Sequence, residues 1–587
     1  MAPIEAREVF LPRRSSISYG MLFWLISLSF PLLLVTADPI FESHIGNFVG
    51  KTLEFKDGVK VDAFYGVPFA RPPINDLRFE KPQDAEFVKE RSAKTLPKVC
   101  VQQDYSNQME MSEDCLYLNI FRPHQPSEDK NGYPALFFIH GGAFQVGSSH
   151  EHTTDYVAEN YAGRGVVTII PQYRLGLFGF ASTGPEQFAG NYGLWDLRRA
   201  LLFTRKNAKS LFLDPSKITV GGYSAGSAAA SALSVSEHTR DLFLQTLQFS
   251  GSIFAEWALS NRPVIHTEKL VELLKCDDQS SAKIKKCLRQ KSVRELQVAA
   301  VKVHETDGEI NSFDYTPRLD ADFFTADIAQ LIESGKPKSS MMSLTENEGL
   351  LFTIYFSHAI ETFPHALTKD KKDKFSLGDF KKFVRNVVAP QKLFGNKHKE
   401  VTEKIIDFYL RLKPEHQHDR TFYLDIHGKL LGDIMFVIPQ LLELRHKTAA
   451  GWSIYNILSV HNDFIEENLS HLELYNTTHA IEYAYLFGKG FLGDHKFTEA
   501  DEKYRKLLID AVVTFVKTRS PKSDESPNFV KVNRHHPLIY TELSTEATIK
   551  DPLFANELRF WSKLSEEYEF DIIRGIHKKT LRMRTEL

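Results

Sequence analysis

The chain of 587 residues lacks an excess of charge of either sign. Its 72 basic residues stand against 75 acidic ones, which gives a formal net charge of −3. A nucleic-acid-binding domain normally carries a basic excess or a basic stripe, so we expect no nucleic-acid partner. Hydrophobic residues make up 42% of the chain, too large a share for a disordered protein. The sequence therefore predicts a folded protein with a sizeable core.

Two further absences concern repeats and metal ligands. The sequence shows no internal repeat. Its histidines, including His416 and His418 in the segment HQHD, do not stand in a metal-ligand pattern, so we expect no metal site. Nothing in the sequence indicates an oligomer, although none is excluded.

One long apolar run is present, at residues 21–37 (MLFWLISLSFPLLLVTA), and no second run of comparable apolarity follows it. Arg13 and Arg14 precede the run, which ends in a small residue, Ala37. This order is typical of a secretory signal peptide cleaved after Ala37. The alternative is an uncleaved signal anchor, but Pro31 interrupts the run and the flank after it is not basic. We therefore expect no stable membrane span in the mature chain.

Cysteine is scarce, with four residues that form two sequence-local pairs: Cys100 with Cys115, and Cys276 with Cys287. In an oxidising compartment two disulfides are the natural interpretation, and free buried thiols are the alternative. Four cysteines allow three pairings. Proximity in the sequence favours Cys100–Cys115 and Cys276–Cys287.

Other signals also concern the secretory pathway. Asn468 and Asn476 stand in N-glycosylation acceptor motifs. The chain ends in Arg-Thr-Glu-Leu at residues 584–587, which is close to a luminal retention signal of the K-D-E-L type. A plain surface tail is the alternative. We predict a protein of the secretory pathway, either retained in the lumen of the endoplasmic reticulum or secreted.

After the signal, short apolar runs alternate with longer helical patterns, which indicates an α/β fold with a mostly parallel sheet. Strands are expected at residues 135–140, 166–170, 217–222, 245–249, 340–344 and 451–457, and helices at residues 194–211 and 225–233. We predict three parts: a signal peptide at residues 1–37, one large α/β domain at 38–570 and a basic C-terminal tail at 571–587.

The pentapeptide Gly222-Tyr223-Ser224-Ala225-Gly226 matches G-x-S-x-G between an expected strand and a helix of small residues. A sharp strand-to-helix turn leaves no room for Cβ atoms at the two flanking positions, which explains the two glycines. The turn raises the serine hydroxyl above the sheet and directs the N-terminus of the helix toward it. The motif therefore predicts that Ser224 is a nucleophile; the alternative is a purely structural turn.

A second glycine-rich segment, His140-Gly141-Gly142-Ala143, follows the expected strand at residues 135–140. It is similar to loops whose backbone N–H groups stabilise an oxyanion, since glycine lets the backbone come close to the reacting atoms. We predict that Gly142, Ala143 and Ala225 donate to such an oxyanion hole. His140 itself is interpreted as a structural residue.

Taken together, these motifs resemble the type-B carboxylesterases of the cholinesterase/carboxylesterase family, which are α/β-hydrolases. The resemblance covers most of the mature chain. It implies a large central sheet flanked by helices in a single catalytic domain. The matching segments are residues 64–79 (FYGVPFARPPINDLRF), 112–121 (SEDCLYLNIF), 140–144 (HGGAF), 190–196 (GNYGLWD), 222–226 (GYSAG), 249–252 (FSGS), 346–349 (ENEG) and 479–488 (HAIEYAYLFG).

The resemblance also implies the other two catalytic residues, in the chain order Ser, acid, His. The family's acid is a Glu just before a Gly, which fits Glu348 before Gly349; Glu346 is the competing choice. The family's histidine lies in H-x-x-E-[IL]-x-[YF]-[LV]-F-G, which fits His479; His461 is the rival. We predict a Ser224–Glu348–His479 triad that needs no metal and no organic cofactor.

Several structural pairs are implied in the same way: Arg78 with Glu113, Arg174 with Asp196, and the two sequence-local disulfides, with Ser250 behind the acid. The family's third disulfide has no cysteines here.

Two departures from the cholinesterase pattern bear on the substrate. Cholinesterases carry a tryptophan where this chain has Tyr105, and a glutamate where it has Tyr223. Both changes remove features that favour a cationic choline ester. The resemblance therefore predicts a general carboxylesterase that acts on small-molecule neutral carboxylic esters. The alternatives are a lipid or hormone esterase and a catalytically silent adhesion or binding protein on the same scaffold.

Overall fold

The computed structural model describes residues 38–103, 110–184, 187–304, 309–355, 365–412, 418–461, 472, 474, 477–488 and 496–577. The predicted signal peptide at residues 1–37 lies outside them. So do Tyr105, His416, Asn468, Asn476 and residues 578–587, which include the predicted retention signal.

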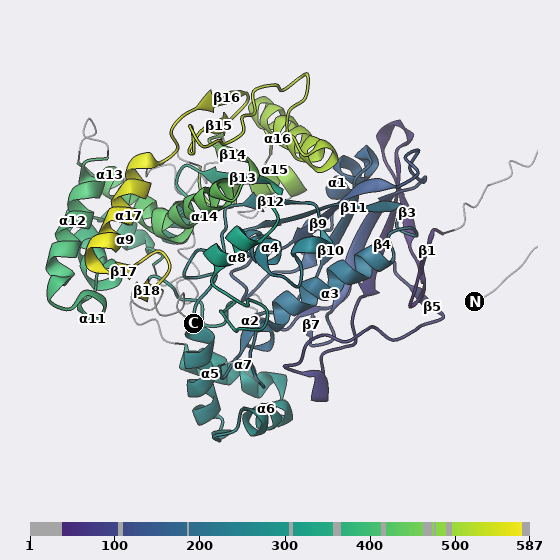
Figure 1. Ribbon diagram of the computed structural model, residues 1–587, viewed down its shortest axis with the longest axis horizontal. Coiled ribbons are helices and arrows are strands. Elements are labelled where there is room, and N and C mark those ends of the chain that lie inside the picture. The colour runs from purple at the N-terminus through teal and green to yellow at the C-terminus, as the bar shows by residue number, and fades with distance from the viewer. Residues whose placement is uncertain are drawn as a thin grey trace, which may run out of the picture. The chain divides into compact units, whose positions relative to one another are not determined.

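A sheet of eleven strands forms the centre of the unit that begins at Asp38 (Figure 1). Its order is β16-β15-β14-β13-β12-β11-β9-β10-β8-β4-β3, and the seven strands from β15 to β10 run parallel to one another. The α/β fold with a large, mostly parallel sheet is thus confirmed. The strands are β3 (Lys51–Glu54), β4 (Lys60–Pro68), β8 (Tyr117–Pro123), β9 (Tyr133–Ile139), β10 (Val167–Pro171), β11 (Leu213–Tyr223), β12 (Gln245–Phe249), β13 (Ser339–Thr345), β14 (Ser453–Ser459), β15 (Tyr540–Leu543) and β16 (Ala547–Lys550).

Small pairings complete the strand structure. A three-stranded sheet contains β1 (Ile40–Ser43), β2 (Gly46–Val49) and β5 (Glu90–Ser92). Two-stranded sheets pair β6 (Val99–Cys100) with β7 (Met111–Ser112), and β17 (Phe570–Asp571) with β18 (Ile576–His577).

The helices cover the sheet and extend beyond it; Figure 1 shows α9, α11, α12, α13 and α17 gathered at one end. The α-helices are α1 (Asp155–Asn160), α2 (Gly176–Phe180), α3 (Tyr192–Lys206), α4 (Ala225–Val235), α5 (Arg262–Leu273), α6 (Ser281–Gln290), α7 (Val293–Val303), α8 (Ile328–Ser334), α9 (Lys369–Asp373), α10 (Leu377–Phe383), α11 (Gln391–Phe394), α12 (His398–Leu410), α13 (Arg420–Gly432), α14 (Ile438–Ala449), α15 (Ile481–Phe487), α16 (Glu499–Thr518) and α17 (Ala555–Tyr568). In the described part of the chain the π-helical turns are η6 (Leu351–Tyr355), η7 (Val384–Val388) and η9 (Asp433–Val437). Short 3₁₀ turns are η1 (Lys56–Gly58), η2 (Asn75–Leu77), η3 (Ser149–His152), η4 (Ala162–Arg164), η5 (Arg240–Leu242) and η8 (Gly395–Lys397).

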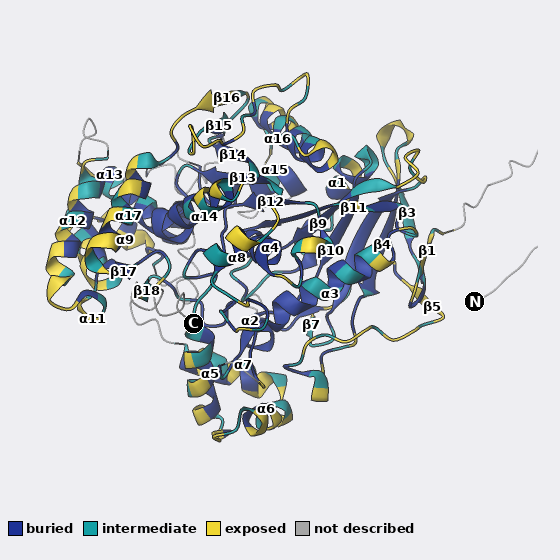
Figure 2. Ribbon diagram, viewed as in Figure 1, coloured by how far each residue is buried: buried dark blue, intermediate teal, exposed yellow. Residues whose placement is uncertain are grey.

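The core lies between the sheet and its helices (Figure 2). Every residue of β10 and of α4 is buried. A parallel strand covered on both faces needs apolar side chains throughout, which explains the continuous run VVTII in the sequence. The small residues of α4 let it approach the sheet closely, as the sequence predicts, and this helix carries the predicted nucleophile at its N-terminus.

The predicted helix at residues 194–211 ends too late. Helix α3 ends at Lys206, because the Asn207 side chain bonds back to the Phe203 carbonyl (2.8 Å) and holds His44 on another segment. The chain then turns and enters β11 at Leu213, earlier than the predicted strand start at residue 217. Leu213 is paired in register with Tyr133 of β9.

The predicted C-terminal tail also begins too early. Residues 570–577 form the β17–β18 hairpin, and Ile572 and Ile573 are buried. The Ile573 carbonyl accepts from the Glu256 N–H (3.0 Å), and Arg574 pairs with Asp327 (2.7 Å). Apolar burial therefore makes residues 571–577 part of the folded unit, and a tail can begin only after His577.

Candidate active site

Ser224 occupies a strained turn between β11 and α4. Its backbone has φ 55° and ψ −120°, a conformation that a residue with a side chain adopts only when the surroundings force it. A Cβ on Gly222 would lie 2.1 Å from the Gly226 carbonyl oxygen, and one on Gly226 would lie 2.0 Å from the Ile139 carbonyl oxygen. The two glycines of the motif are thus required by close backbone contacts, and the turn holds the Ser224 hydroxyl at the C-terminal end of β11.

Ser224, His479 and Glu348 form one hydrogen-bonded chain. The Ser224 Oγ lies 3.0 Å from the Nε2 of His479, and the Nδ1 of His479 lies 2.7 Å from the Oε2 of Glu348. All three side chains are buried, with Ser224 the most exposed at 8%. The structure therefore brings together three residues that lie more than a hundred positions apart, in the geometry that a serine hydrolase uses.

Short loops hold the acid and the histidine together. The Thr477 carbonyl accepts from the Asn347 N–H (2.9 Å), and the Thr477 hydroxyl accepts from the Glu346 N–H (3.0 Å). The Thr478 hydroxyl accepts from the Leu351 N–H (2.7 Å). These bonds fix the loop that carries His479 against the loop that follows β13. Sequence reasoning gave these two threonines no role in the site.

The second oxygen of Glu348 is also occupied. Its Oε1 accepts from the Ser250 hydroxyl (2.7 Å) and from the Thr345 N–H (2.7 Å). The predicted position of Ser250 behind the acid is confirmed. With both oxygens bonded, the carboxylate has a fixed orientation that presents Oε2 to the imidazole.

The predicted oxyanion-hole donors lie on two segments next to Ser224. Gly142 and Ala143 follow β9 and have positive φ angles of 102° and 54°, and Ala225 is the first residue of α4. The first N–H groups of a helix have no intrahelical partner. Among the described residues, no backbone carbonyl accepts from the N–H groups of these three residues. The left-handed conformation of Ala143 costs about 1 kcal/mol relative to glycine.

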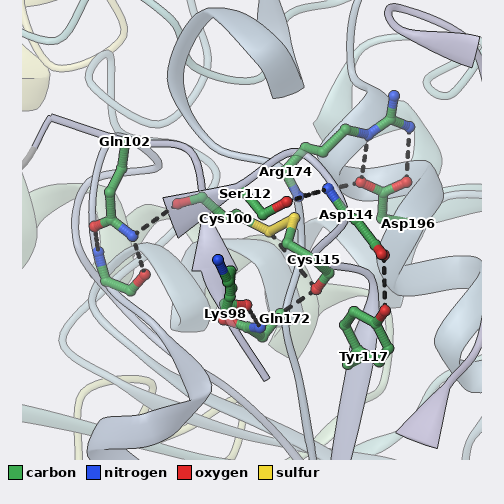
Figure 3. The surroundings of a disulfide bond; sticks show 11 residues. Lys98, Cys100, Gln102, Ser112, Asp114, Cys115, Tyr117, Gln172, Arg174 and Asp196 are labelled. Atoms are coloured by element: carbon green, nitrogen blue, oxygen red, sulfur yellow. Dashed lines mark hydrogen bonds and ion pairs between the residues drawn. A yellow bond between two sulfur atoms is a disulfide. The ribbon is translucent and has the colours of Figure 1, made fainter. Parts of the chain in front are cut away.

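The segment that contains Gly142 is tied to the first disulfide. A disulfide joins Cys100 to Cys115. The Gln102 side chain donates to the Cys100 carbonyl (3.1 Å), as Figure 3 shows. The Gln102 side chain accepts from the Gly147 N–H (2.7 Å) and donates to the Gly147 carbonyl (2.9 Å). Gly147 in turn lies against Gly141, because a Cβ on Gly147 would be only 2.6 Å from the Gly141 carbonyl oxygen. The disulfide thus supports the glycine-rich loop.

The remaining predicted pairs are also in place. Arg78 binds Glu113 through two hydrogen bonds of 2.6 Å, and Arg174 binds Asp196 through two of 2.7 Å, the second pair drawn in Figure 3. A second disulfide joins Cys276 to Cys287.

Aromatic rings enclose His479. The rings of Phe436, Tyr223 and Phe352 have centroids 4.3, 5.1 and 5.3 Å from the imidazole. Phe436 lies on the π-helical turn η9 and Phe352 on η6. Sequence reasoning missed both phenylalanines, because neither stands in a motif and their contact with His479 depends on how distant segments pack.

A further acidic residue, Glu482 on α15, is buried near the site. It accepts a hydrogen bond from Ser343 (3.2 Å). Burial and the neighbouring Glu348 carboxylate raise the pKa of Glu482 to about 7. Its side chain is therefore largely protonated in mildly acidic solution, which limits the negative charge around His479.

The rival residues lie outside the hydrogen-bonded chain. Glu346 is half-buried and contacts Thr477. His461 bonds through Nε2 to Asp501 (2.9 Å). His140 bonds to the Gly141 carbonyl and stacks on Tyr173, and burial lowers its pKa to about 4, so it is neutral. The structural interpretation of His140 fits these contacts.

Two searches of the described residues bear on metals and membranes. No group of three or more His, Cys, Asp or Glu side chains in this part of the chain is placed to hold a metal ion. No helix within the same residues has both the length and the apolar character needed to cross a membrane.

Comparison with known proteins gives one consistent result. The model of the carboxylesterase family matches residues 37–561. Gut esterase 1 of Caenorhabditis elegans is 31% identical over 92% of this chain and 95% of its own length. The pyrethroid hydrolase Ces2a of Mus musculus is 27% identical over 92% and 95%. Bile salt-activated lipase of Bos taurus is 26% identical over 86% and 84%.

Proposed function

The chain belongs to the carboxylesterase family and is a carboxylic ester hydrolase, and we propose that it acts through Ser224, with His479 as the base and Glu348 as its acidic partner. The observation that carries this proposal is the unbroken contact from the Ser224 Oγ to His479 and on to Glu348, at 3.0 and 2.7 Å. A serine hydroxyl is a weak nucleophile unless an adjacent base accepts its proton.

Acylation follows from this geometry. Glu348 accepts from the Nδ1–H of His479, so the Nε2 of the neutral imidazole is free to accept from Ser224. As the Ser224 oxygen bonds to the ester carbonyl carbon, its proton passes to Nε2. The tetrahedral intermediate then collapses, the bond to the alcohol oxygen breaks, and His479 returns the proton to the departing alcohol. The product of this half is an acyl group on Ser224.

Deacylation repeats the sequence with water. His479 accepts a proton from water, whose oxygen attacks the acyl carbonyl, and the Ser224 oxygen then leaves and regains the proton. Negative charge develops on the carbonyl oxygen in both halves. The N–H groups of Gly142, Ala143 and Ala225 would stabilise it, and loss of one such donor typically costs about 2.7–4 kcal/mol.

The surroundings favour neutral esters over cationic ones. Tyr223 occupies the position before the nucleophile, and its ring packs on His479, so this position brings no negative charge to the site. The raised pKa of Glu482 suppresses a second negative charge at mildly acidic pH. Phe352 and Phe436 present apolar surface beside the imidazole. An uncharged acyl or alcohol group fits such walls better than an ammonium group does.

The cellular route is also part of the proposal. Two disulfides close short loops in the folded unit, and such bonds persist in oxidising compartments. We propose that residues 1–37 direct the chain to the secretory pathway and that the C-terminal Arg-Thr-Glu-Leu retains it in the endoplasmic reticulum.

Hydrolysis of p-nitrophenyl esters from acetate to decanoate, with acetylthiocholine as the cationic probe, tests the proposal. Wild type should hydrolyse the neutral esters and prefer them to the cation, and Ser224→Ala should lose the activity. The chain-length optimum measures the size of the acyl pocket. A correctly folded wild type that hydrolyses none of the esters, or an active Ser224→Ala, would contradict the assignment.

A further inference from the structure

A cavity of about 540 Å³ lies apart from the triad. The loop after β12, helix α5, the turns around residues 309–311 and 387–393, and the C-terminal β17–β18 hairpin form its walls. None of Ser224, Glu348 and His479 lines it. The volume is within the range of small-molecule sites in proteins. We propose that this cavity is a binding site for a cationic amphiphile, with the ammonium group on Glu256 and the alkyl part on the apolar wall.

Apolar side chains cover much of the cavity wall. Ile253 and Leu259 come from the loop after β12, Leu393 from α11, and Ile572 and Ile576 from the hairpin. Ile265 of α5 also lines the cavity and is 50% exposed, which places it where the cavity meets solvent. An alkyl chain or a hydrophobic ring would remove this surface from water.

Three cations of the cavity wall, Arg262, Lys392 and Arg574, have acidic partners. Arg262 places its Nη1 on Glu309 and its Nη2 on Asp314 (3.2 Å). Lys392 pairs with Glu309 (2.6 Å). On the hairpin, Arg574 pairs with Asp327 in the same manner. An anionic ligand would have to compete with these carboxylates for each guanidinium or ammonium group.

The acidic residue Glu256 differs from these three cations in its pairing. Among the described residues its carboxylate forms no ion pair. The Asn311 side chain donates to the Glu256 backbone carbonyl (3.4 Å), and Arg262, whose charge lowers the pKa of Glu256, is already held by two carboxylates. Burial raises the pKa of Glu256 to about 7, as expected for a carboxylate without a close cation. A ligand ammonium would supply the missing partner through a charge-assisted hydrogen bond.

The imidazole of His266 gives a second acceptor in the same wall. Its Nε2 lies 3.2 Å from the Asp314 carboxylate, so Nε2 carries the proton. Burial lowers the pKa of His266, which leaves the ring neutral and makes Nδ1 an acceptor. This buried Nδ1 has no partner among the described residues. The unsatisfied Nε of Arg262 is a donor, but the charge of that guanidinium is already balanced.

The hairpin that closes the cavity is shaped around Glu256. Gly575 has a φ of 63°, and a Cβ there would lie 2.3 Å from the Cγ of Glu256. The Glu256 N–H bonds to the Ile573 carbonyl. Glycine at this turn therefore leaves space for the Glu256 side chain, and the C-terminal hairpin holds its backbone.

Calorimetric titration of the whole protein with n-octylamine, n-octanol and octanoate tests the site, at about pH 8, above the pKa of Glu256. Octylamine should bind at least about tenfold more tightly than the other two, because only it offers a cation to Glu256. Glu256→Gln should abolish this preference, since the amide keeps the shape but not the charge. Glu272→Gln, the same change at an exposed position of α5 outside the cavity, should leave octylamine binding unchanged.

A second variant keeps the test independent of how well Glu256→Gln folds. Ile265→Lys places a positive charge at the exposed edge of the cavity and should weaken octylamine binding several-fold. Equal affinity for octylamine in wild type, Glu256→Gln and Ile265→Lys would overturn the proposal, because any binding would then occur elsewhere, such as at the triad. Tighter binding of octanoate than of octylamine would overturn it as well.

Discussion

Two buried histidine–carboxylate pairs lie within one stretch of this chain, and only one of them meets a serine. His479 bonds to Glu348 and His461 to Asp501, at 2.7 and 2.9 Å. Aromatic rings pack on both imidazoles, with Tyr504 stacked on His461 at 4.8 Å. In each pair the carboxylate accepts further hydrogen bonds that fix its orientation.

The two pairs differ in the other groups to which the carboxylate and the imidazole are hydrogen-bonded. Asp501 belongs to the capping box of α16 with Thr498 and also accepts from the Tyr485 hydroxyl (2.6 Å). Glu348 accepts from the Ser250 hydroxyl and the Thr345 N–H, and its histidine faces Ser224 across 3.0 Å. A histidine–acid pair therefore does not identify an active site by itself. The strained turn at Ser224 is what distinguishes the first pair.

The largest expected effect separates the two pairs by activity. His479→Phe keeps an aromatic ring but removes the base, so kcat/KM for p-nitrophenyl esters should fall by roughly 10⁴-fold or more. His461→Phe is the matched control. It should change kcat/KM by no more than about threefold, because its ring contacts neither Ser224 nor Glu348. Equal losses in both variants would contradict the comparison.

The same two variants should lose similar amounts of stability. Each substitution removes one buried partner from a carboxylate that keeps other hydrogen bonds, so the free energy of unfolding should fall by about 1–3 kcal/mol in both. Urea unfolding of both variants measures this. A much larger loss of stability in His479→Phe than in His461→Phe would show that its lower kcat/KM reflects unfolding and not the loss of the base.

Glu482 connects the two pairs and should give a pH signature. It lies close enough to Glu348 for that charge to raise its pKa, and it also bonds to Ser459, which accepts from the Tyr504 hydroxyl (3.0 Å). With a pKa of about 7 folded and 4.5 unfolded, the native state holds the extra proton between these values. The contribution of Glu482 to stability should therefore be fully present below about pH 4.5 and should be lost as pH rises toward 7.

Measured against Glu482→Gln, which cannot titrate, the free energy of unfolding of wild type should decrease by about 3 kcal/mol across this range and then level off. Parallel stability curves for the two proteins would mean that Glu482 is ionised throughout and that the two pairs are not connected through it.

The smallest expected effect concerns the support of the acid. Ser250→Ala removes one hydrogen bond from Glu348 and should lower kcat/KM by about five- to thirtyfold, the equivalent of about 1–2 kcal/mol. Ser227→Ala is the control. Its hydroxyl bonds the Gly251 carbonyl nearby (2.6 Å) but does not touch Glu348, so it should leave kcat/KM close to wild type. A loss in both would indicate general disruption of this region.

Short-range constraints made much of the fold and the candidate site predictable. The turn at Ser224, the small-residue helix α4 and the buried parallel strands each follow from a few adjacent residues, whose close contacts leave little choice. The resemblance to a family then supplied Glu348 and His479, which no local pattern places near Ser224.

Features that depend on packing between distant segments could not be predicted from adjacent residues. Phe436 reaches His479 from a π-helical turn, Thr478 bonds the Leu351 N–H, and the β17–β18 hairpin closes on Glu256. Helical periodicity in the sequence also predicts a helix that continues beyond the observed end of α3. The Asn207 side chain ends this helix, and it also bonds to His44 outside the helix. In each case tertiary contacts, absent from the local sequence, decide the outcome.

The most direct test of the central claim, that Ser224 is the nucleophile activated by His479, is peptide mass spectrometry after reaction with a fluorophosphonate. We expect one phosphonyl group on the peptide that contains Ser224 in wild type, with simultaneous loss of ester hydrolysis, and greatly slowed labelling in His479→Phe. Labelling of a different residue, or full inactivation without modification of Ser224, would contradict the account.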